Sequence, residues 1–157
     1  MQTAYLKTPL GIAEITGDAR GVSKISIGDF DIKNSPEISE ILELAVNQLE
    51  AYFTTKHPKF TFKTHLQGTD FQKKVWHELS KIPFGKTISY LELAKNLGDV
   101  KAVRAVAAAN ARNPIWIVVP CHRVIGSDGS LTGYAGGVWR KKWLLEHENP
   151  SNQPTLF

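Results

Sequence analysis

Hydrophobic and polar residues alternate in the first part of the chain in a way that is typical of β-strands. The alternation covers residues 4–6, 11–15 and 22–27, and turn-forming residues at 17–21 separate the last two segments. A two-residue period places successive side chains on opposite faces of a sheet, so one face can pack on a core. The pattern predicts a hairpin or short meander. Residues 60–63 alternate again and are interpreted as a further strand.

An amphipathic helix is predicted between these strands. Ser35, Pro36 and Glu37 combine an N-cap residue, a proline suited to the first helical position and an early acid. Apolar residues follow at helical spacing as far as Phe53, so the helix is expected to pack on the strands. The polar stretch 65–68 resembles a linker, which predicts an N-terminal domain of residues 1–66.

The remaining chain changes to a helical pattern. Thr69 and Gln72 have capping-box spacing, and Pro83 to Gly85 would end the helix that they begin. Ser89 and Glu92 repeat that spacing ahead of a short helix that Gly98 can end. Another helix is predicted over about 101–112, where Asn113 precedes Pro114 and so disfavours helical geometry. Helix, tight turn and helix together predict a helix-turn-helix unit.

The end of the chain supplies the rest of a winged arrangement. The apolar run 115–119 is interpreted as a buried strand, the glycine-rich stretch 126–137 as a wing, and the residues around Trp143 as a last amphipathic helix. We therefore predict an α+β protein. Its N-terminal α/β domain, a short antiparallel sheet plus a helix, is followed by a mostly helical winged helix-turn-helix-like domain over 67–150 and a C-terminal tail over 151–157.

Charge is unevenly divided along the chain. Residues 1–65 carry 7 Lys and Arg against 8 Asp and Glu, whereas residues 66–157 carry 12 against 7. Excess positive charge favours a polyanionic partner, although an ordinary solvated surface is equally compatible with it. The alanine-rich helix 101–112 leaves a similar choice, because small side chains permit close approach either to a partner helix or to a DNA groove.

Composition narrows the setting in which the protein works. The single cysteine of the 157 residues excludes an intramolecular disulfide, which suits a reducing compartment. No secretory signal and no segment as long as a membrane span is recognisable. We expect a cytoplasmic protein, a monomer, with no membrane attachment.

Cys121 is the candidate nucleophile, because His122 stands directly beside this only thiol. A free thiol is mostly protonated at neutral pH and needs a base to become reactive. Neighbouring strand residues point to opposite faces, so a direct bond between the two side chains would require a bend or a bridging water. The alternative interpretation is that Cys121 is a small buried hydrophobe.

Several motifs in one order resemble the O6-alkylguanine-DNA alkyltransferases, also called methylated-DNA–protein-cysteine methyltransferases. The similarity covers about residues 69–148 and lies in 84–90, 102–106, 113–114, 120–124, 134–137 and 143–148. The resemblance implies that O6-alkylguanine in duplex DNA irreversibly transfers its alkyl group to the protein's own cysteine. The implied catalytic residues are Cys121, His122 as a water-bridged base, Glu148 as its orienting acid, Tyr90 as proton donor and Asn113 as support for the active-site turn.

The same resemblance implies a DNA-binding surface and a pocket for an extruded base. Arg104 matches the residue that fills the space left by the flipped nucleotide, in the minor groove. The expected DNA-binding residues are Arg104, Ala105, Ala108, Arg112 and Arg123, and the expected pocket residues are Val124, Tyr134, Ala135 and Gly136. Some relatives carry a hydroxyl residue at the position of Ala135, so the alkyl preference stays open.

Neither a metal nor a cofactor is expected, because the one cysteine is committed to catalysis and the histidines lack ligand spacing. A thioether has no easy reversal, so each molecule should act once. Two other classes of protein compete with this interpretation. A lesion-binding or winged-helix DNA-binding module without transferase activity is disfavoured by the presence of Cys121, and a cysteine hydrolase by the lack of an oxyanion-site motif.

Overall fold

The computed structural model describes residues 1–56 and 58–150, which fall into two compact units. The first unit contains Met1–Gln67 and also Pro114–Trp116, and the second contains Gly68–Asn113 and, among the described residues, 117–150. Domains with the predicted limits 1–66 and 67–150 stay a prediction. The predicted tail, residues 151–157, lies outside the described residues.

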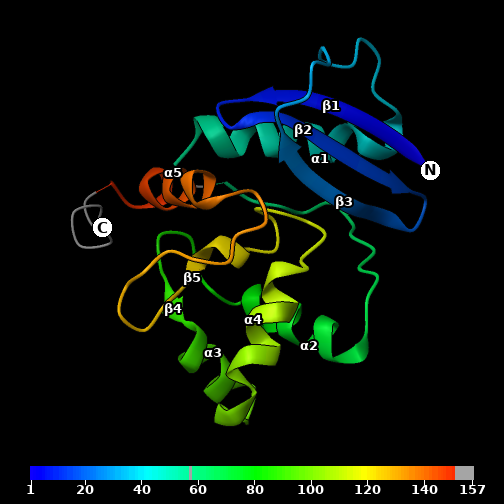
Figure 1. The fold of residues 1–157 in the computed structure, drawn as a ribbon. Coiled ribbons are helices and arrows are strands. Elements are labelled where there is room, and N and C mark those ends of the chain that lie inside the picture. Colours follow the sequence, from blue (N-terminus) through cyan, green and yellow to red (C-terminus); the bar gives the residue numbers. More distant parts are fainter. Residues whose placement is uncertain (57, 151–157) are drawn as a thin grey trace. The chain divides into compact units, whose positions relative to one another are not determined.

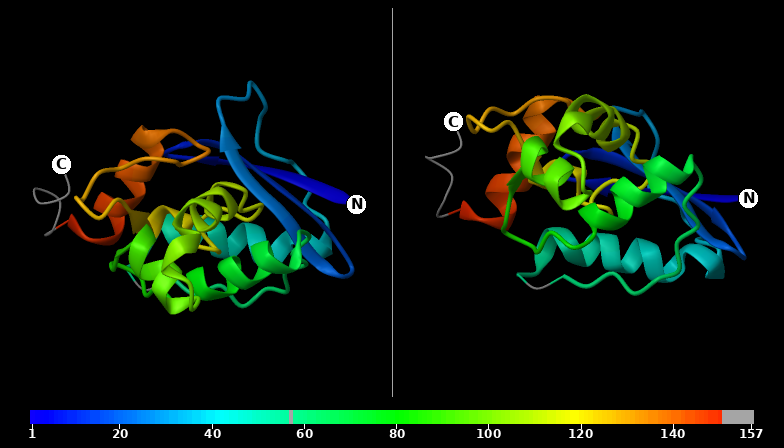
Figure 2. Two further views of the ribbon diagram at one scale, coloured as in Figure 1. Left: turned by 60° about the horizontal axis from the view of Figure 1, so that its bottom comes forward. Right: turned by 90° about the horizontal axis from the view of Figure 1, so that it is seen from below.

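A three-stranded antiparallel sheet and one helix build the first unit. The strands β1 (Gln2–Thr8), β2 (Gly11–Asp18) and β3 (Gly21–Gly28) pair in sequence order, with a register shift between Thr16 and Gly17. The helix α1 (Glu40–Thr54) lies along the sheet (Figures 1 and 2) and contacts all three strands. Alternate residues such as Ile15 and Ile25 are buried, as are Leu42 and Leu49 of α1. The predicted meander with a packed helix is confirmed.

Two predictions for this unit are wrong in detail. Helix α1 begins at Glu40 rather than near Pro36, because Ser35 bonds strand β1 instead: its N–H donates to the Tyr5 carbonyl and its Oγ accepts from the Tyr5 N–H. Residues 60–63 form no strand. Pairing there is confined to the isolated bridge between Thr64 and Val22, so the alternation at 60–63 has no partner strand to extend it.

Helices dominate the second unit. Its elements are α2 (Asp70–Leu79), β4 (Ile88–Ser89), α3 (Tyr90–Asn96), the 3₁₀ turn η1 (Val100–Ala102), α4 (Val103–Ala111), the 3₁₀ turn η2 (Cys121–Arg123), β5 (Val124–Ile125) and α5 (Val138–Glu148). Both bonds of the predicted capping box join Thr69 and Gln72 at the start of α2. At α3 the Ser89 side chain accepts from the Glu92 N–H. Gly98 follows α3 with φ 89°, a conformation that glycine adopts without strain.

The predicted helix-turn-helix is confirmed in α3 and α4, which pack on each other. The buried side of α4 includes Val106 and Ala109. The Ala109 carbonyl accepts a hydrogen bond from Trp76 Nε1 of α2 at 2.9 Å. This bond satisfies the buried indole N–H and joins α2 to the buried side of α4. The other side of α4 is exposed to solvent.

The apolar run 115–119 is not the predicted strand. Ile115 makes one bridge, with Ile25 in the first unit, and the chain then turns at Ile117, whose φ is 72°. A left-handed conformation is rare for a β-branched residue and ends extended pairing at once. Burial accounts for the hydrophobicity of the run, since Ile115, Ile117 and Val119 are all buried. Cys121 consequently begins a 3₁₀ turn rather than following a strand.

The wing predicted over 126–137 is an irregular loop between β5 and α5. Before it, β5 pairs in parallel with β4, so the chain after Cys121 is tied to the start of α3. No helix among residues 1–56 and 58–150 combines the length and the apolar character that a membrane span requires.

The capping box of α2 offers a test of this fold. Thr69→Ala removes the side-chain acceptor for the Gln72 N–H and should lower the free energy of unfolding by about 1 kcal/mol. Urea denaturation measures the change. Thr69→Ser is the matched control, because it keeps the hydroxyl and should retain most of the stability. Equal losses in the two variants would contradict the role of the cap.

Candidate active site

Cys121 is a buried thiol at the first position of η2. Its exposed fraction is 4%, and its N–H donates to the Val119 carbonyl at 2.8 Å, which closes a tight turn. Burial raises the pKa of the thiol to about 11, although the Asn113 side chain and the charge of Lys141 oppose the rise. At neutral pH the thiol is therefore protonated, and it needs a base to become a nucleophile.

Two asparagines hold the backbone on either side of this thiol. Asn113 Nδ2 donates to the Val119 carbonyl at 2.7 Å, and Asn110 Nδ2 donates to the Cys121 carbonyl at 3.4 Å. Both side chains are buried, so these bonds also satisfy polar groups that water does not reach. Asn113 matched a family motif in the sequence, whereas Asn110 was missed because it stands inside a helical pattern of alanines.

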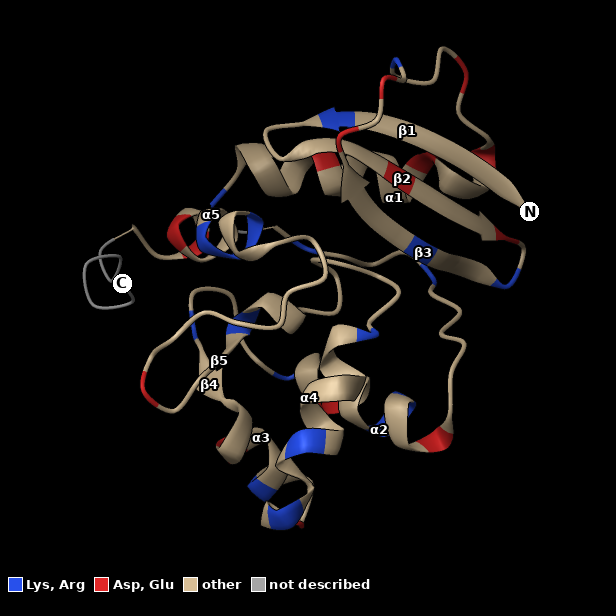
Figure 3. Ribbon diagram, viewed as in Figure 1, with Lys and Arg blue, Asp and Glu red and all other residues tan. Residues whose placement is uncertain are grey.

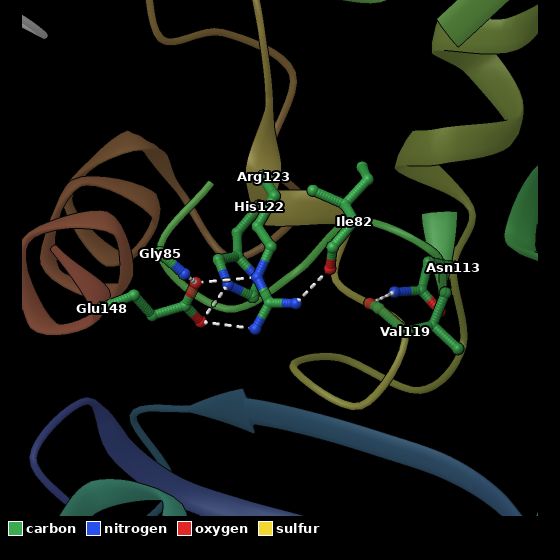
Figure 4. A network of polar contacts seen from close by, with 7 residues as sticks. All are labelled: Ile82, Gly85, Asn113, Val119, His122, Arg123 and Glu148. Carbon is green, nitrogen blue, oxygen red and sulfur yellow. Dashed lines mark hydrogen bonds and ion pairs between the residues drawn. The ribbon is translucent and has the colours of Figure 1, made fainter. Parts of the chain in front are cut away.

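His122 and Glu148 form a buried pair. His122 Nε2 lies 2.7 Å from Glu148 Oε2, and the exposed fractions of the two side chains are 0% and 1% (Figure 4). Against an ionised carboxylate Nε2 carries the proton, which leaves Nδ1 as the acceptor nitrogen. Within the described part of the chain, Nδ1 has no hydrogen-bond partner. The geometry thus presents a neutral imidazole with one lone pair available.

The structure corrects the position expected for Arg123. Its guanidinium is buried, with Nε 2.7 Å from Glu148 Oε1 and Nη2 3.0 Å from Oε2, while Nη1 donates to the Ile82 carbonyl at 2.7 Å (Figure 4). A guanidinium engaged on all these atoms cannot reach a DNA phosphate. The prediction that Arg123 binds DNA is wrong, because both edges of the fork are used inside the protein.

Arg123 and Glu148 together set the charge state of the pair. Burial alone would raise the pKa of Glu148, but His122 and Arg123 outweigh it and hold that pKa well below the ordinary value. Burial lowers the pKa of His122, and Arg123 and Lys141 add to this effect, while Glu148 opposes it. Since Arg123 already compensates the carboxylate, His122 is neutral at neutral pH and can accept a proton.

Tyr90 lies in a second polar cluster, together with a lysine that the sequence did not single out. The Tyr90 hydroxyl donates to the Thr132 carbonyl at 3.1 Å, and Lys141 Nζ donates to the same carbonyl at 2.8 Å and to the Tyr90 hydroxyl at 3.4 Å. Lys141 is fully buried, and this burial lowers its pKa to about 8. The only sequence signal for this lysine was its position on the apolar face of the predicted last helix. That signal is weak, because lysine side chains are seldom buried.

The ionisable groups of the two clusters act on one another. Burial raises the pKa of Tyr90, and the charge of Cys121 raises it further. Lys141 in turn lowers the pKa of Cys121. A thiol, a neutral imidazole, a phenol and an ammonium group thus share one electrostatic environment, which can move a proton away from sulfur and deliver another to a leaving group.

The exposed side of α4 carries the other predicted contact residues. Arg104, Ala105 and Ala108 of α4 and Arg112, the residue that follows this helix, are exposed, whereas Val106 and Ala109 are buried. Figure 3 shows Lys and Arg gathered along α3, η1 and α4, and the acidic residues there are fewer. The helix therefore offers low relief flanked by positive charge, as a polyanion requires.

The predicted pocket residues stand in β5 and in the loop before α5. Val124, Tyr134 and Gly136 are buried, whereas Ala135 is exposed. Their role in binding a base stays a prediction. The first unit has a surface depression of its own, near residues 30–34, but no thiol or imidazole lines it. The chemistry is therefore assigned to the second unit.

Comparison with known proteins gives a consistent result. Residues 70–150 match the model of the 6-O-methylguanine DNA methyltransferase, DNA binding domain family. A methylated-DNA–protein-cysteine methyltransferase of Methanosarcina acetivorans is 45% identical, over 94% of this chain and 98% of its own length. One from Mycobacterium bovis is 55% identical, over 72% of this chain and 70% of its own.

Solved structures agree in fold. The crystal structure of O6-methylguanine methyltransferase from Mycobacterium tuberculosis superposes with a TM-score of 0.83 at 40% identity, covering 95% of this chain and 94% of that one. A complex of the Mycobacterium tuberculosis protein with DNA has a TM-score of 0.83 at 41% identity, with coverage of 98% and 97%.

The depressed pKa of Glu148 predicts a specific loss of stability in acid. A carboxyl group whose pKa is lowered by folding contributes stability above its ordinary value of 4.5 and loses it as pH falls toward the folded pKa. Unfolding free energies from urea titrations should therefore fall by about 1–3 kcal/mol more in the wild type than in Glu148→Gln as pH is lowered from about 5 to about 3. His122 adds a loss of the same sign at higher pH.

Glu50→Gln serves as the matched control, because Glu50 is exposed on α1. This variant should keep the wild-type slope below pH 4.5. If Glu148→Gln kept that slope as well, the carboxylate would not be held ionised by its partners.

Proposed function

The chain belongs to the methylated-DNA–protein-cysteine methyltransferase family, and on that premise we propose that Cys121 accepts the alkyl group from O6-alkylguanine in duplex DNA. Its function is DNA repair by an O6-methylguanine DNA methyltransferase activity. The observation that carries the assignment is the buried thiol adjacent in sequence to a neutral imidazole that Glu148 and Arg123 hold in place.

The reaction starts with a proton transfer. His122 Nδ1 is the acceptor, and the thiol proton reaches it through a water molecule that bridges Cys121 and His122. Glu148 stabilises the imidazolium that forms, in the role of the orienting acid of a triad. The base is needed because a thiol with a pKa of about 11 supplies almost no thiolate by itself at neutral pH.

Alkyl transfer follows in one displacement. The Cys121 thiolate attacks the carbon bonded to O6, the S–C bond forms and the C–O6 bond breaks with its electron pair moving to guanine. Tyr90 donates its phenolic proton to the guanine as it leaves, so that a neutral base departs. Lys141, 3.4 Å from the Tyr90 hydroxyl, stabilises the phenolate that this step creates. Solvent then gives a proton back to the Tyr90 phenolate and takes the proton from the His122 imidazolium.

The product sets the stoichiometry. Breaking the S–C bond of the thioether would require the Cys121 thiolate to depart, which is a poor leaving group, and the single cysteine provides no second thiol that could accept the alkyl group. Each protein molecule therefore repairs one lesion.

Duplex DNA must release the damaged nucleotide before the thiol can reach it. Extrusion costs a few kcal/mol, and less for a mispaired damaged base. The exposed side of α4 enters the minor groove, where Ala105 and Ala108 permit close approach and Arg104 fills the vacated space. Arg112 lies on the same side and contacts the phosphate backbone. Val124, Tyr134, Ala135 and Gly136 surround the extruded base.

Intact-mass measurement tests the proposed acceptor directly. Wild-type protein incubated with a duplex containing O6-methylguanine should gain the mass of one methyl group, and peptide mapping should place it on Cys121. Cys121→Ser is the control and should gain nothing while still binding the duplex. If reduced wild-type protein formed no adduct while a known alkyltransferase reacted, the transferase assignment would be wrong and lesion binding would remain.

Arg104→Ala tests the extrusion role. The variant should methylate itself at least about tenfold more slowly from duplex DNA, because the flipped state loses the side chain that fills the stack. Its rate with free O6-methylguanine base should change less than about twofold, since no extrusion is required. Lys95→Ala, which removes a neighbouring α3 charge, controls for weaker DNA binding. Equal slowing with duplex and free base would contradict the role of Arg104.

A further inference from the structure

Two consecutive basic residues of α5, Arg140 and Lys141, hold the loop that precedes this helix. Lys141 Nζ donates to the Thr132 carbonyl at 2.8 Å, and Arg140 Nη1 donates to the Gly136 carbonyl at 3.0 Å. Both residues are buried. The loop 132–136 is therefore fixed at its two ends by cationic donors, and Figure 1 shows it running back to the start of α5.

The loop has little conformational preference of its own. Gly133 and Gly137 adopt φ of 71° and 92°, and Gly136 directly precedes Gly137. Glycine-rich backbone loses more entropy on ordering than other backbone, so the loop depends on external anchors. Inside it, the Gly137 N–H donates to the Tyr134 carbonyl at 3.0 Å, which closes only a local turn.

The anchored segment faces the reacting centre. Burial raises the pKa of Tyr134 well above its ordinary value, Cys121 raises it further and Arg140 lowers it, so both groups act on this ring. A Cβ at Gly133 would lie 3.2 Å from the Tyr90 hydroxyl. Gly133 therefore lies beside the Tyr90 hydroxyl, and Tyr134 lies within range of the charge of Cys121. A shift of the backbone from 133 to 136 would change the space beside these groups, and this part of the backbone is called the loop wall below.

Arg140 is suited to hold this wall in one place. Its guanidinium stacks on the Trp139 ring, with Cζ 4.4 Å from the ring centroid, while Nη1 bonds Gly136. A planar fork held on an aromatic face loses little further freedom when it donates. Lys142, two residues after Arg140, is half-exposed and pairs with Glu146 at 3.9 Å, so it does not hold the loop.

We propose that Arg140 is a specificity-determining positioning residue, which limits the size of the transferred alkyl group by fixing the Gly136 carbonyl. This inference rests on the proposed function. With the bond intact, the loop fits a methyl group closely. Without this bond the loop moves outward. The free energy of ordering the loop around O6-methylguanine then increases, and a bulkier alkyl group has more space.

Single-turnover kinetics with two lesions in one duplex sequence test the proposal. Rate constants are measured for O6-methylguanine and O6-butylguanine in wild type, Arg140→Met and Arg140→Gln. The butyl-to-methyl ratio should rise at least about fivefold in Arg140→Met, which corresponds to about 1 kcal/mol of lost discrimination. In Arg140→Gln the butyl-to-methyl ratio should also rise, but by less, because a neutral donor remains. A rise in this variant decides the matter if Arg140→Met does not fold.

Lys142→Met is the matched control, since it removes one positive charge from the same helix, and its ratio should stay at the wild-type value. A ratio is insensitive to the fraction of active protein, so a merely structural defect would slow both lesions equally and leave it unchanged. An unchanged ratio in the folded Arg140 variants overturns the inference alone. Failure of wild-type protein to react with either lesion overturns the proposed function instead.

Discussion

The second unit depends on a buried carboxylate that serves two partners. Glu148 sits at the end of α5 and pairs with His122 at 2.7 Å and with Arg123 through two bonds. An ionised carboxylate inside a protein is costly unless its oxygens are paired and bonded, and removing one partner of a buried pair typically costs about 3–5 kcal/mol. Because His122 and Arg123 both belong to η2, the same contacts fix the turn that carries Cys121.

This arrangement separates two tasks that one residue could not perform. Arg123 neutralises Glu148, and the compensated carboxylate then orients His122 without forcing a proton onto it. A fully charged imidazole could not act as a base. The pair is further tied to the turn after α2, because the Gly85 N–H approaches Glu148 Oε1 at 3.5 Å and Asn149 Nδ2 donates to the Gly85 carbonyl at 3.0 Å. The reacting group is thus supported by α5, by η2 and by a loop distant in sequence.

Burial of the thiol is the complementary constraint. Water would solvate a thiolate and lower its pKa, but it would also compete for the electrophile. Here desolvation keeps Cys121 protonated until a base acts, and Asn113 and Lys141 offset part of that cost. Lys141 also bonds Tyr90 and Thr132, so one buried ammonium links the groups that we propose as nucleophile, proton donor and pocket loop. Through these contacts Lys141, which no sequence motif singles out, connects the groups of the candidate site.

Local patterns in the sequence determined most of the elements and indicated the candidate nucleophile. Near neighbours in the sequence decide the period-2 segments of the sheet and the side-chain caps at Thr69 and Ser89. They also place His122 directly beside Cys121. Contacts between residues distant in the sequence decided the features that the sequence predicted wrongly. Only the fold shows that Ser35 bonds a strand instead of capping α1, that the chain turns at Ile117, and that Arg123 faces Glu148 rather than DNA. A charged side chain looks the same in a sequence whether it faces water or a buried partner, and only tertiary structure supplies that partner.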